Sequence, residues 1–450
     1  MATAPPRPNL RSPKGLLNKV RGLVKRPAIR QRVIAPVSFD ASILVINTIT
    51  GVIIARKLGP SGRGELTATL AIVQTTGWLA SMGGRAAISF HHSQNPEEGG
   101  RLMTSWLLAA VPLSLVTILG AELLLPTLFG AQSAEAIHVA QIYAPLIIVN
   151  VASVVFIGIL LGDQRFLAYN VVRILIPGVT VLGYVAFLAA GDLTVVTALI
   201  ANGAALVVST VASAIICLNR HGLERPSRSL LKTTIWYGVR AHGGDIAGFV
   251  SARLDLLIIP AFLSATSVGL YSVATNVGSI IASLTATIAV FALPIAARDI
   301  NHAARTVIRA FQVTLLIGGT MALVLVVIGE FAIKLVYGND FAGAAPPLRV
   351  LLPGEMLEAA TVVLLAGMLA ANRPFLSTVA YAPSAILTIG GLLIFLQSGG
   401  IMAAATVTTC AYTISFVITV NLYKRTAGLE WHHFLRPPPV RPGAHPITQE

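Results

Sequence analysis

Charged residues are scarce in this chain. Of its 450 residues, 11% are Asp, Glu, Lys or Arg and 55% are hydrophobic, and apolar runs recur almost everywhere beyond residue 36. This composition excludes an ordinary soluble globular protein. Most runs reach the roughly 20 apolar residues that a helix needs to cross a bilayer. We therefore predict an all-α integral membrane protein with many spans.

Cysteine is nearly absent, since the chain contains only Cys217 and Cys410. Each lies inside an apolar stretch, where cysteine ordinarily acts as a small packed hydrophobe. We therefore predict no disulfide and no metal site. The adjacent histidine pairs at 91–92 and 432–433 do not change this, because neighbouring side chains on a helix do not converge on one ion. We expect both pairs at the membrane interface.

Signatures of catalysis are missing as well. The sequence has no Gly-rich phosphate loop with a lysine, no aspartate pair in a cytoplasmic loop and no His/Cys cluster with metal-ligand spacing. The outward connections are too short to form a catalytic domain. A membrane-embedded polymerase or glycosyltransferase is therefore disfavoured, and we predict neither catalytic residues nor a cofactor.

Acidic residues are absent from the first 36 positions, which contain nine basic residues. A basic segment of this kind before a first span is typical of a cytoplasmic tail beside anionic membrane lipids. Nucleic acid need not be invoked as its partner. The tail lacks the apolar core and the small-residue cleavage site of a signal peptide, so we expect it to be retained.

Charged, Pro-rich and Gly-rich breaks divide the apolar part of the chain into twelve predicted spans. These are 37–57, 65–90, 102–128, 136–161, 166–190, 193–218, 233–261, 268–294, 306–329, 346–371, 375–397 and 400–423. Lys and Arg concentrate after the even-numbered spans, and most connections after odd-numbered spans contain neither. The positive-inside rule then predicts a multi-pass protein of the inner (cytoplasmic) membrane with both termini cytoplasmic. The exceptions are Arg56, Lys57, Arg63 and Lys334.

The chain also repeats itself. An offset of 205 residues brings Asp40 onto Asp245, and an offset of 208 aligns a collinear series from Glu122 to Gly191 with the second half. Six spans per half give parallel repeats around a central cavity, an architecture of alternating-access transporters. The predicted parts are a basic cytoplasmic N-terminal tail (1–36), a first six-helix repeat (37–219), a cytoplasmic linker (220–232), a second six-helix repeat (233–425) and a Pro-rich cytoplasmic tail (426–450).

Three stretches carry a family resemblance. The segments "LGPSGRGELTATLAIVQ", "SATSVGLYSVATNVGSI" and "FALPIAARD" resemble the multidrug/oligosaccharidyl-lipid/polysaccharide exporter superfamily, and within it the polysaccharide repeat-unit flippases. The resemblance implies two V-shaped bundles around a central cavity and export of a polyprenyl-diphosphate-linked oligosaccharide from the inner to the outer leaflet. Polysaccharide assembly proteins would be possible partners. A lipid II-type flippase and a multidrug cation antiporter of the same superfamily remain alternatives.

Three arginines inside predicted spans are candidates for substrate binding. A charge at the bilayer centre costs at least about 2.5–3.5 kcal/mol, so it must face protein or water. Arg253 lies in the seventh span, and its guanidinium offers a planar fork of donors for a diphosphate. Arg240 in the same span and Arg173 in the fifth are further candidates. The alternative for Arg253 and for Asp255 is that each pairs with a neighbouring span and fixes the bundle.

Five acidic residues are candidates for gating or ion coupling. Asp40 and Asp245 occupy matching positions near the cytoplasmic ends of the first spans of the two halves, where each would close a gate or cap a helix. Asp255 would steady its neighbouring arginine or take protons. Glu355 and Glu358 are three residues apart on one helix face. They would bind a proton or Na⁺, or neutralise the arginines of the seventh span.

Overall fold

The computed structural model describes residues 35–298, 300–371, 373 and 375–436. This part of the chain is almost entirely helical and contains no β-strand. Two short 3-10 helices are η2 (Pro96–Glu98) and η3 (Asn339–Ala344). The α-helices are α3 (Ala35–Ala80), α4 (Gly84–Gln94), α5 (Gly99–Leu128), α6 (Ala134–Tyr143), α7 (Leu146–Gly162), α8 (Phe166–Ala189), α9 (Val195–His221), α10 (Arg228–Arg253), α11 (Asp255–Phe262), α12 (Ala265–Arg298), α13 (Ile300–Tyr337), α14 (Ala345–Ala370), α15 (Phe375–Thr426) and α16 (His432–Leu435).

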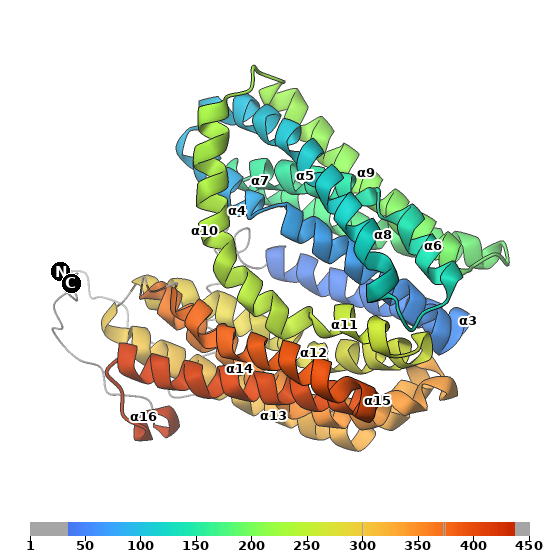
Figure 1. The fold of residues 1–450 in the computed structure, drawn as a ribbon. Coiled ribbons are helices and arrows are strands. Elements are labelled where there is room, and N and C mark those ends of the chain that lie inside the picture. The colour runs from blue at the N-terminus through green and yellow to red at the C-terminus, as the bar shows by residue number, and fades with distance from the viewer. Residues whose placement is uncertain (1–34, 299, 372, 374, 437–450) are drawn as a thin grey trace, which may run out of the picture.

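The helices form two bundles. In Figure 1, α3 to α9 make the upper bundle, which we name the first bundle, and α11 to α15 make the lower, second bundle. The bundles meet at the right of the view, where Pro60 and Gly64, just after the Gly59 kink of α3, lie against Gly269 and Ala265 at the start of α12; we name this the closed end. They diverge toward the upper left, and residues 222–227, which lead from α9 into α10, lie at the top of the view; we name this the link end. Helix α10 runs from one bundle to the other.

The described helices contain the expected spans. Eight are long and apolar enough to cross a membrane, and the pair α6–α7, bent by 40°, adds a ninth. Helices α3 and α15 each contain a kink at a glycine of positive φ, Gly59 at 68° and Gly400 at 56°, a conformation that a residue without a Cβ adopts readily. Each of these two long helices therefore comprises two spans. With α10 and α11 as the seventh span, the twelve-helix architecture predicted from the sequence is confirmed.

Two predicted spans are nevertheless interrupted. Span 65–90 breaks after Ala80, because Met82 and Gly83 have φ values of 46° and 71°, and α4 then completes it. Span 233–261 is not one helix either, since α10 ends at Arg253 and α11 begins at Asp255. Leu254 between them keeps helical dihedral angles, φ −66° and ψ −25°, so the interruption is a local distortion of the span. The expectation that Arg253 and Asp255 face different sides of this span stays a prediction.

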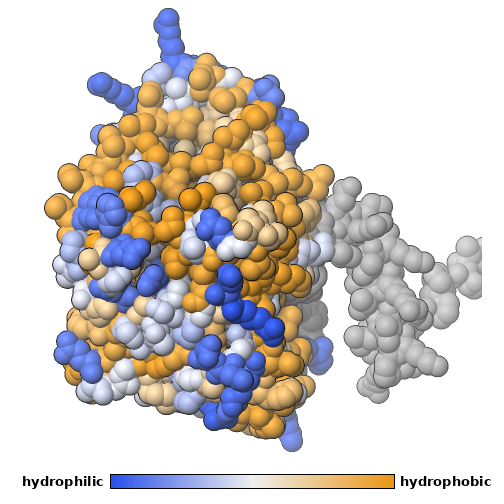
Figure 2. All heavy atoms as spheres, turned by 90° about the vertical axis from the view of Figure 1, so that its right-hand side faces the viewer, coloured by the Kyte–Doolittle hydropathy of each residue, from blue (hydrophilic) through white to orange (hydrophobic). Residues whose placement is uncertain are grey.

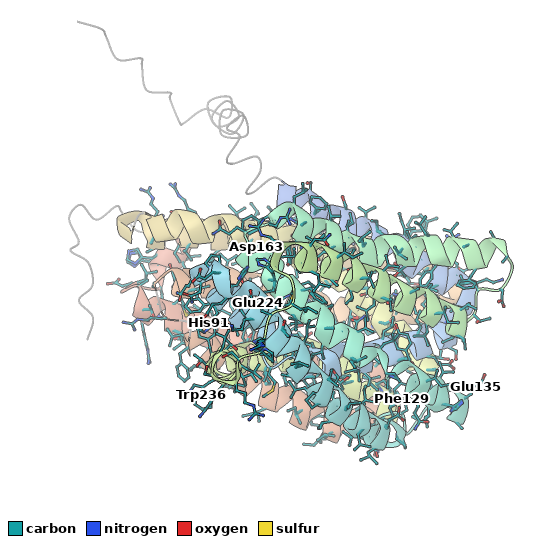
Figure 3. All side chains as sticks on the ribbon, turned by 90° about the horizontal axis from the view of Figure 1, so that it is seen from above. His91, Phe129, Glu135, Asp163, Glu224 and Trp236 are labelled. Atoms are coloured by element: carbon teal, nitrogen blue, oxygen red, sulfur yellow. The ribbon has the colours of Figure 1, made fainter. Side chains whose placement is uncertain are left out.

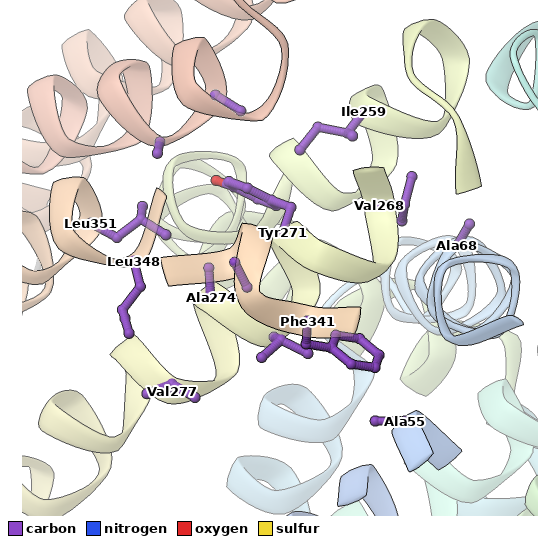
Figure 4. Packing of buried hydrophobic residues seen from close by; sticks show 14 of the residues in the cluster. Ala55, Ala68, Ile259, Val268, Tyr271, Ala274, Val277, Phe341, Leu348 and Leu351 are labelled. Atoms are coloured by element: carbon purple, nitrogen blue, oxygen red, sulfur yellow. The ribbon is translucent and has the colours of Figure 1, made fainter. Parts of the chain in front are cut away.

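The two bundles share a hydrophobic core at the closed end. Its buried members include Ala55 and Ala68 of α3 together with Val268 and Tyr271 of α12. Figure 4 shows Ala68 facing Val268 across the junction, and Tyr271 is completely buried. Further clusters lie within one bundle each. The closed end is therefore packed as tightly as a protein interior, whereas each bundle keeps a core of its own.

Large apolar side chains cover the outside of both bundles. Leu123, Val327 and Ile386 are each more than 70% exposed. Such extensive apolar exposure is unusual in soluble monomers and suits contact with lipid chains. Figure 2 looks onto the closed end and shows hydrophilic residues in patches between broad hydrophobic areas.

Candidate functional site

At the closed end the two bundles contact each other at glycines. A Cβ atom on Gly64 of α3 would lie 1.8 Å from the carbonyl oxygen of Ala265, and one on Gly269 of α12 would lie 1.9 Å from that of Pro60. Neither position has room for any side chain in this arrangement. Small residues allow helix backbones to approach this closely inside membranes. The closed end is therefore sealed by backbone packed on backbone.

Two arginines of the first bundle hold the second bundle at the same end. Arg63 is only 4% exposed. Its Nε donates to Ser272 Oγ at 3.0 Å, its Nη1 donates to the Gly51 carbonyl at 2.6 Å, and its guanidinium lies 5.2 Å from the centre of the Tyr337 ring. These contacts join α3 to α12 and α13, and so compensate a buried charge.

Arg56 performs a similar task at the end of α13. Its guanidinium donates to the carbonyls of Leu335 and Val336, the latter at 2.9 Å. The last carbonyls of a helix have no partner within the helix, so a cation satisfies them and interacts favourably with the helix dipole. Arg56 and Arg63 are among the exceptions to the charge pattern of the connections. Both bind the opposite bundle, which gives these exceptions a structural reason.

Arg173, a predicted substrate ligand, forms an ion pair with Asp40, a predicted gate residue. The Nη1 atom of Arg173 on α8 lies 2.9 Å from Asp40 Oδ1 on α3, and the two side chains are 35% and 58% exposed. The Arg173 guanidinium also lies 5.3 Å from the centre of the Tyr169 ring. Asp40 lies more than one turn inside α3, so the alternative that it caps a helix N-terminus is wrong. The pair is accessible and joins two helices of the first bundle.

Asp255 is buried and accepts hydrogen bonds that connect neighbouring helices. Only 4% of this residue is exposed. Its Oδ2 accepts from the Tyr271 hydroxyl at 2.6 Å, and its Oδ1 accepts from the Leu256 backbone N–H at 2.8 Å. The Tyr271 hydroxyl is also 3.3 Å from Thr408 Oγ1 on α15. The carboxylate thereby satisfies an N–H in the first turn of α11 and connects the break in the seventh span to α12 and α15.

Glu355 and Glu358 lie on α14 but meet different neighbours. Glu355 is 7% exposed and packs beside Gly278 of α12, where a Cβ would be 3.3 Å from its Cγ. Glu358 accepts a hydrogen bond from the Tyr381 hydroxyl of α15 at 2.6 Å. Ser415 Oγ of the same helix is 3.5 Å from the other oxygen. The described contacts therefore do not bring the two carboxylates together on one ion.

Three of the predicted site residues lie on α10 with side chains outside the described residues. They are Arg240, Asp245 and Arg253. The described part of α10 contacts both bundles. Near the link end Tyr237 stacks on Phe90 of α4, with ring centroids 4.6 Å apart, and farther along Phe249 stacks on Trp78 of α3 at the same separation. Gly248 lies beside Tyr381 of the second bundle.

Among the described residues, one cluster has donor atoms for a metal ion. It comprises His92, Asp163 and His221 of the first bundle. Sequence reasoning missed it, as it missed Arg63, Gly64 and Gly269. The "LGPSGRGELTATLAIVQ" segment contained a signal for Arg63 and Gly64, because two glycines flanking an arginine at the end of a span are a pattern for close helix contact.

Comparisons with known proteins give the family. Residues 53–346 match the model of the polysaccharide biosynthesis protein family. The chain is 24% identical over 397 residues, 84% of its own length and 80% of the relative's, to the probable low-salt glycan biosynthesis flippase Agl15 of Haloferax volcanii.

Solved structures agree on the fold. One similar structure is the lipid II flippase MurJ in an inward closed conformation, with a TM-score of 0.74, 15% identity and 89% of each chain covered. Another is an inward-facing multidrug resistance MATE family transporter of the MOP superfamily, with a TM-score of 0.68, 15% identity, and 87% of this chain and 98% of that chain covered. The chain therefore belongs to the polysaccharide biosynthesis protein family, has the fold of the multidrug/oligosaccharidyl-lipid/polysaccharide exporter superfamily, and is a multi-pass membrane transporter rather than an enzyme.

Proposed function

We propose that this protein is a flippase that moves a polyprenyl-diphosphate-linked oligosaccharide from the inner to the outer leaflet by alternating access. The observation that carries the proposal is the asymmetry of the two ends. The bundles are sealed against each other through Gly64 and Gly269, yet diverge toward the link end. Two parallel repeats joined at one end can expose a path to one side of the membrane at a time. The family and the flippase that this chain resembles support the substrate class.

The orientation is part of this proposal. The link end would face the cytoplasm, with both termini, in the cytoplasmic membrane, and the closed end would face outward. The excess of Lys and Arg in the link-end connections supports it, and the basic tail would contact anionic lipids there. Reporter fusions after His221 and after Ser264 should report opposite compartments. The same compartment for both would overturn the orientation.

The substrate diphosphate would bind Arg173, with Arg240 and Arg253 as further ligands. The Arg173–Asp40 pair is partly exposed, so its carboxylate can be exchanged for a phosphate. A guanidinium fork suits two phosphate oxygens and keeps its charge at any relevant pH. Release of Asp40 from Arg173 would then couple binding to movement of α3 against α8. The acids Glu355, which is buried, and Glu358, which is half-buried, are proposed proton or Na⁺ sites for coupling.

Transport of a labelled lipid-linked oligosaccharide in proteoliposomes tests the role of Arg173. A charged hydrogen bond contributes about 1.5–3 kcal/mol, so Arg173→Ala should lower transport about 10- to 150-fold. Arg173→Lys should recover part of it, because an ammonium keeps the charge but loses the fork. Arg165→Ala, at the exposed start of the same helix, is the matched control and should transport normally.

Two outcomes would contradict this role. One is normal transport by Arg173→Ala. The other is a lowered melting temperature that Asp40→Ala restores together with transport, because that would make the pair structural. An exposed pair is worth about 0–1 kcal/mol, so little loss of stability is expected. Competition by lipid II, or by an organic cation, would instead favour the two alternative substrates of the superfamily.

A further inference from the structure

Three side chains that are distant in the sequence converge in the first bundle at the link end. His92 lies in the last turn of α4, Asp163 directly follows α7, and His221 is the last residue of α9. His92 Nε2 lies 3.0 Å from Asp163 Oδ1, and His221 Nε2 lies 3.0 Å from Asp163 Oδ2. Figure 3 shows Asp163 toward the same end as Glu224, away from Phe129 and Glu135. The carboxylate is thus held between two imidazoles.

The cluster is shielded from solvent. The side chains of His92, Asp163 and His221 are 1%, 5% and 10% exposed. The backbone of α5 and α7 packs directly against the two imidazole rings at glycines. A Cβ on Gly99 would lie 2.6 Å from His92 Cε1 and 2.7 Å from His221 Nδ1, and a Cβ on Gly162 would lie 2.8 Å from His92 Cβ. The two imidazoles are therefore held in place by α5 and α7 as well as by the carboxylate.

The donor atoms are of the kinds that bind metals. A neutral imidazole and an ionised carboxylate are the forms that do so. Both Nε2 atoms already lie beside the oxygens of one carboxylate, at 3.0 Å each.

We propose that His92 Nε2, an Asp163 oxygen and His221 Nε2 bind a first-row divalent metal ion, with Zn²⁺ the best match to this donor set. The donor atoms of the three residues all lie within 4.8 Å of one another. Tetrahedral bonds of about 2.0–2.2 Å place donors about 3.3–3.6 Å apart, so each Nε2 must move about 0.5 Å from its carboxylate oxygen and the widest donor pair must close from at most 4.8 Å. The proton that each Nε2 now donates to Asp163 would move to Nδ1 of the same ring or to solvent. Two imidazoles and a carboxylate leave a fourth position for water.

Among the described residues, Arg220 is a cation that contacts the cluster, and this contact must change when an ion binds. Its Nε lies 3.4 Å from Asp163 Oδ2, and its side chain is 53% exposed. A half-exposed arginine can turn toward solvent, so it opposes the ion weakly. The metal would fasten α4, α7 and α9 together where the chain leaves the first bundle. In the internal repeat, the offset of 208 residues aligns Asp163 with Ala371, so the second bundle has no matching carboxylate for such a site at that position.

Metal binding by the purified full-length protein tests this proposal independently of transport. After treatment with chelator, Co²⁺ should bind at one equivalent with the visible absorption of a four- or five-coordinate ion, and Zn²⁺ should displace it. His92→Gln and His221→Gln should each weaken Co²⁺ binding more than about tenfold. The double variant His432→Gln/His433→Gln, which removes an adjacent histidine pair outside the cluster, should bind like the wild type. Zn²⁺ should raise the melting temperature of the wild type and of this control, but not of the two cluster variants.

X-ray absorption of the wild-type Zn²⁺ complex keeps the test decisive if a cluster variant fails to fold. Two imidazoles with oxygen ligands are expected. The proposal is overturned by the absence of saturable binding, by a sulfur ligand, by a spectrum without imidazole, or by binding that follows His432 and His433 instead.

Discussion

Gly64→Ala is the sharpest test of the closed end. The added Cβ would lie 1.8 Å from the Ala265 carbonyl oxygen. Carbon and oxygen need about 3.3 Å, so the bundles must separate locally by about 1.5 Å. Overpacking of a tight contact costs about 1–3 kcal/mol. If that cost is confined to the conformation in which this end is closed, the ratio of closed to open molecules should fall about 5- to 150-fold.

Electron spin resonance can measure that shift as a distance. Spin labels at Asp192 and Ser398, exposed residues at the closed end of the two bundles, would report their separation in proteoliposomes once Cys410 is replaced by serine. Gly64→Ala should enlarge the population with a long distance. Gly120→Ala is the control, since its Cβ would meet nothing within 4 Å and its gain in helix propensity is similar.

The reasoning would be refuted in either of two ways. An unchanged distance distribution with an unchanged melting temperature would mean that the glycine contact is not tight. A lowered melting temperature with an unchanged distance would mean that Gly64 packs equally in all conformations and is no part of a gate.

Two further predictions concern buried polar contacts. Tyr271→Phe removes the hydroxyl that donates a hydrogen bond to Asp255, so it should cost about 1.5–3 kcal/mol of stability and lower the melting temperature. Tyr237→Phe, at a partly exposed stacked ring, is the control and should melt like the wild type. Equal melting temperatures of the two variants would contradict the structural role of Asp255. Arg63→Met removes the hydrogen bond to Ser272 without leaving a buried charge, so it should shift the molecules toward the conformation in which the closed end is open, as Gly64→Ala does. A distance distribution identical to that of the wild type would mean that Arg63 does not hold the two bundles together.

The spans and the repeat could be predicted because they depend on local sequence. Twenty apolar residues commit a segment to a helix in lipid, whatever its neighbours are, since the backbone must satisfy its own hydrogen bonds there. The breaks were harder. Gly83 and Gly84 are a glycine pair of the kind that indicates a break, whereas the distortion at Leu254 has neither proline nor glycine beside it. It coincides with Asp255, whose buried bond to Tyr271 depends on α12.

For the candidate site too, some features could be predicted from the sequence and others depended on the tertiary structure. The sequence by itself determined that Arg173 and Asp40 are charges inside or near spans, because insertion into lipid penalises any charge that lacks a partner or water. The tertiary structure decided that they are each other's partner. It also decided that Arg63 meets Ser272 across 209 positions, and that His92 and His221 lie on either side of Asp163, 71 and 58 positions away. Hydropathy and spacing describe one helix at a time, whereas these contacts depend on which faces of separate helices pack together, and that is a property of the whole bundle.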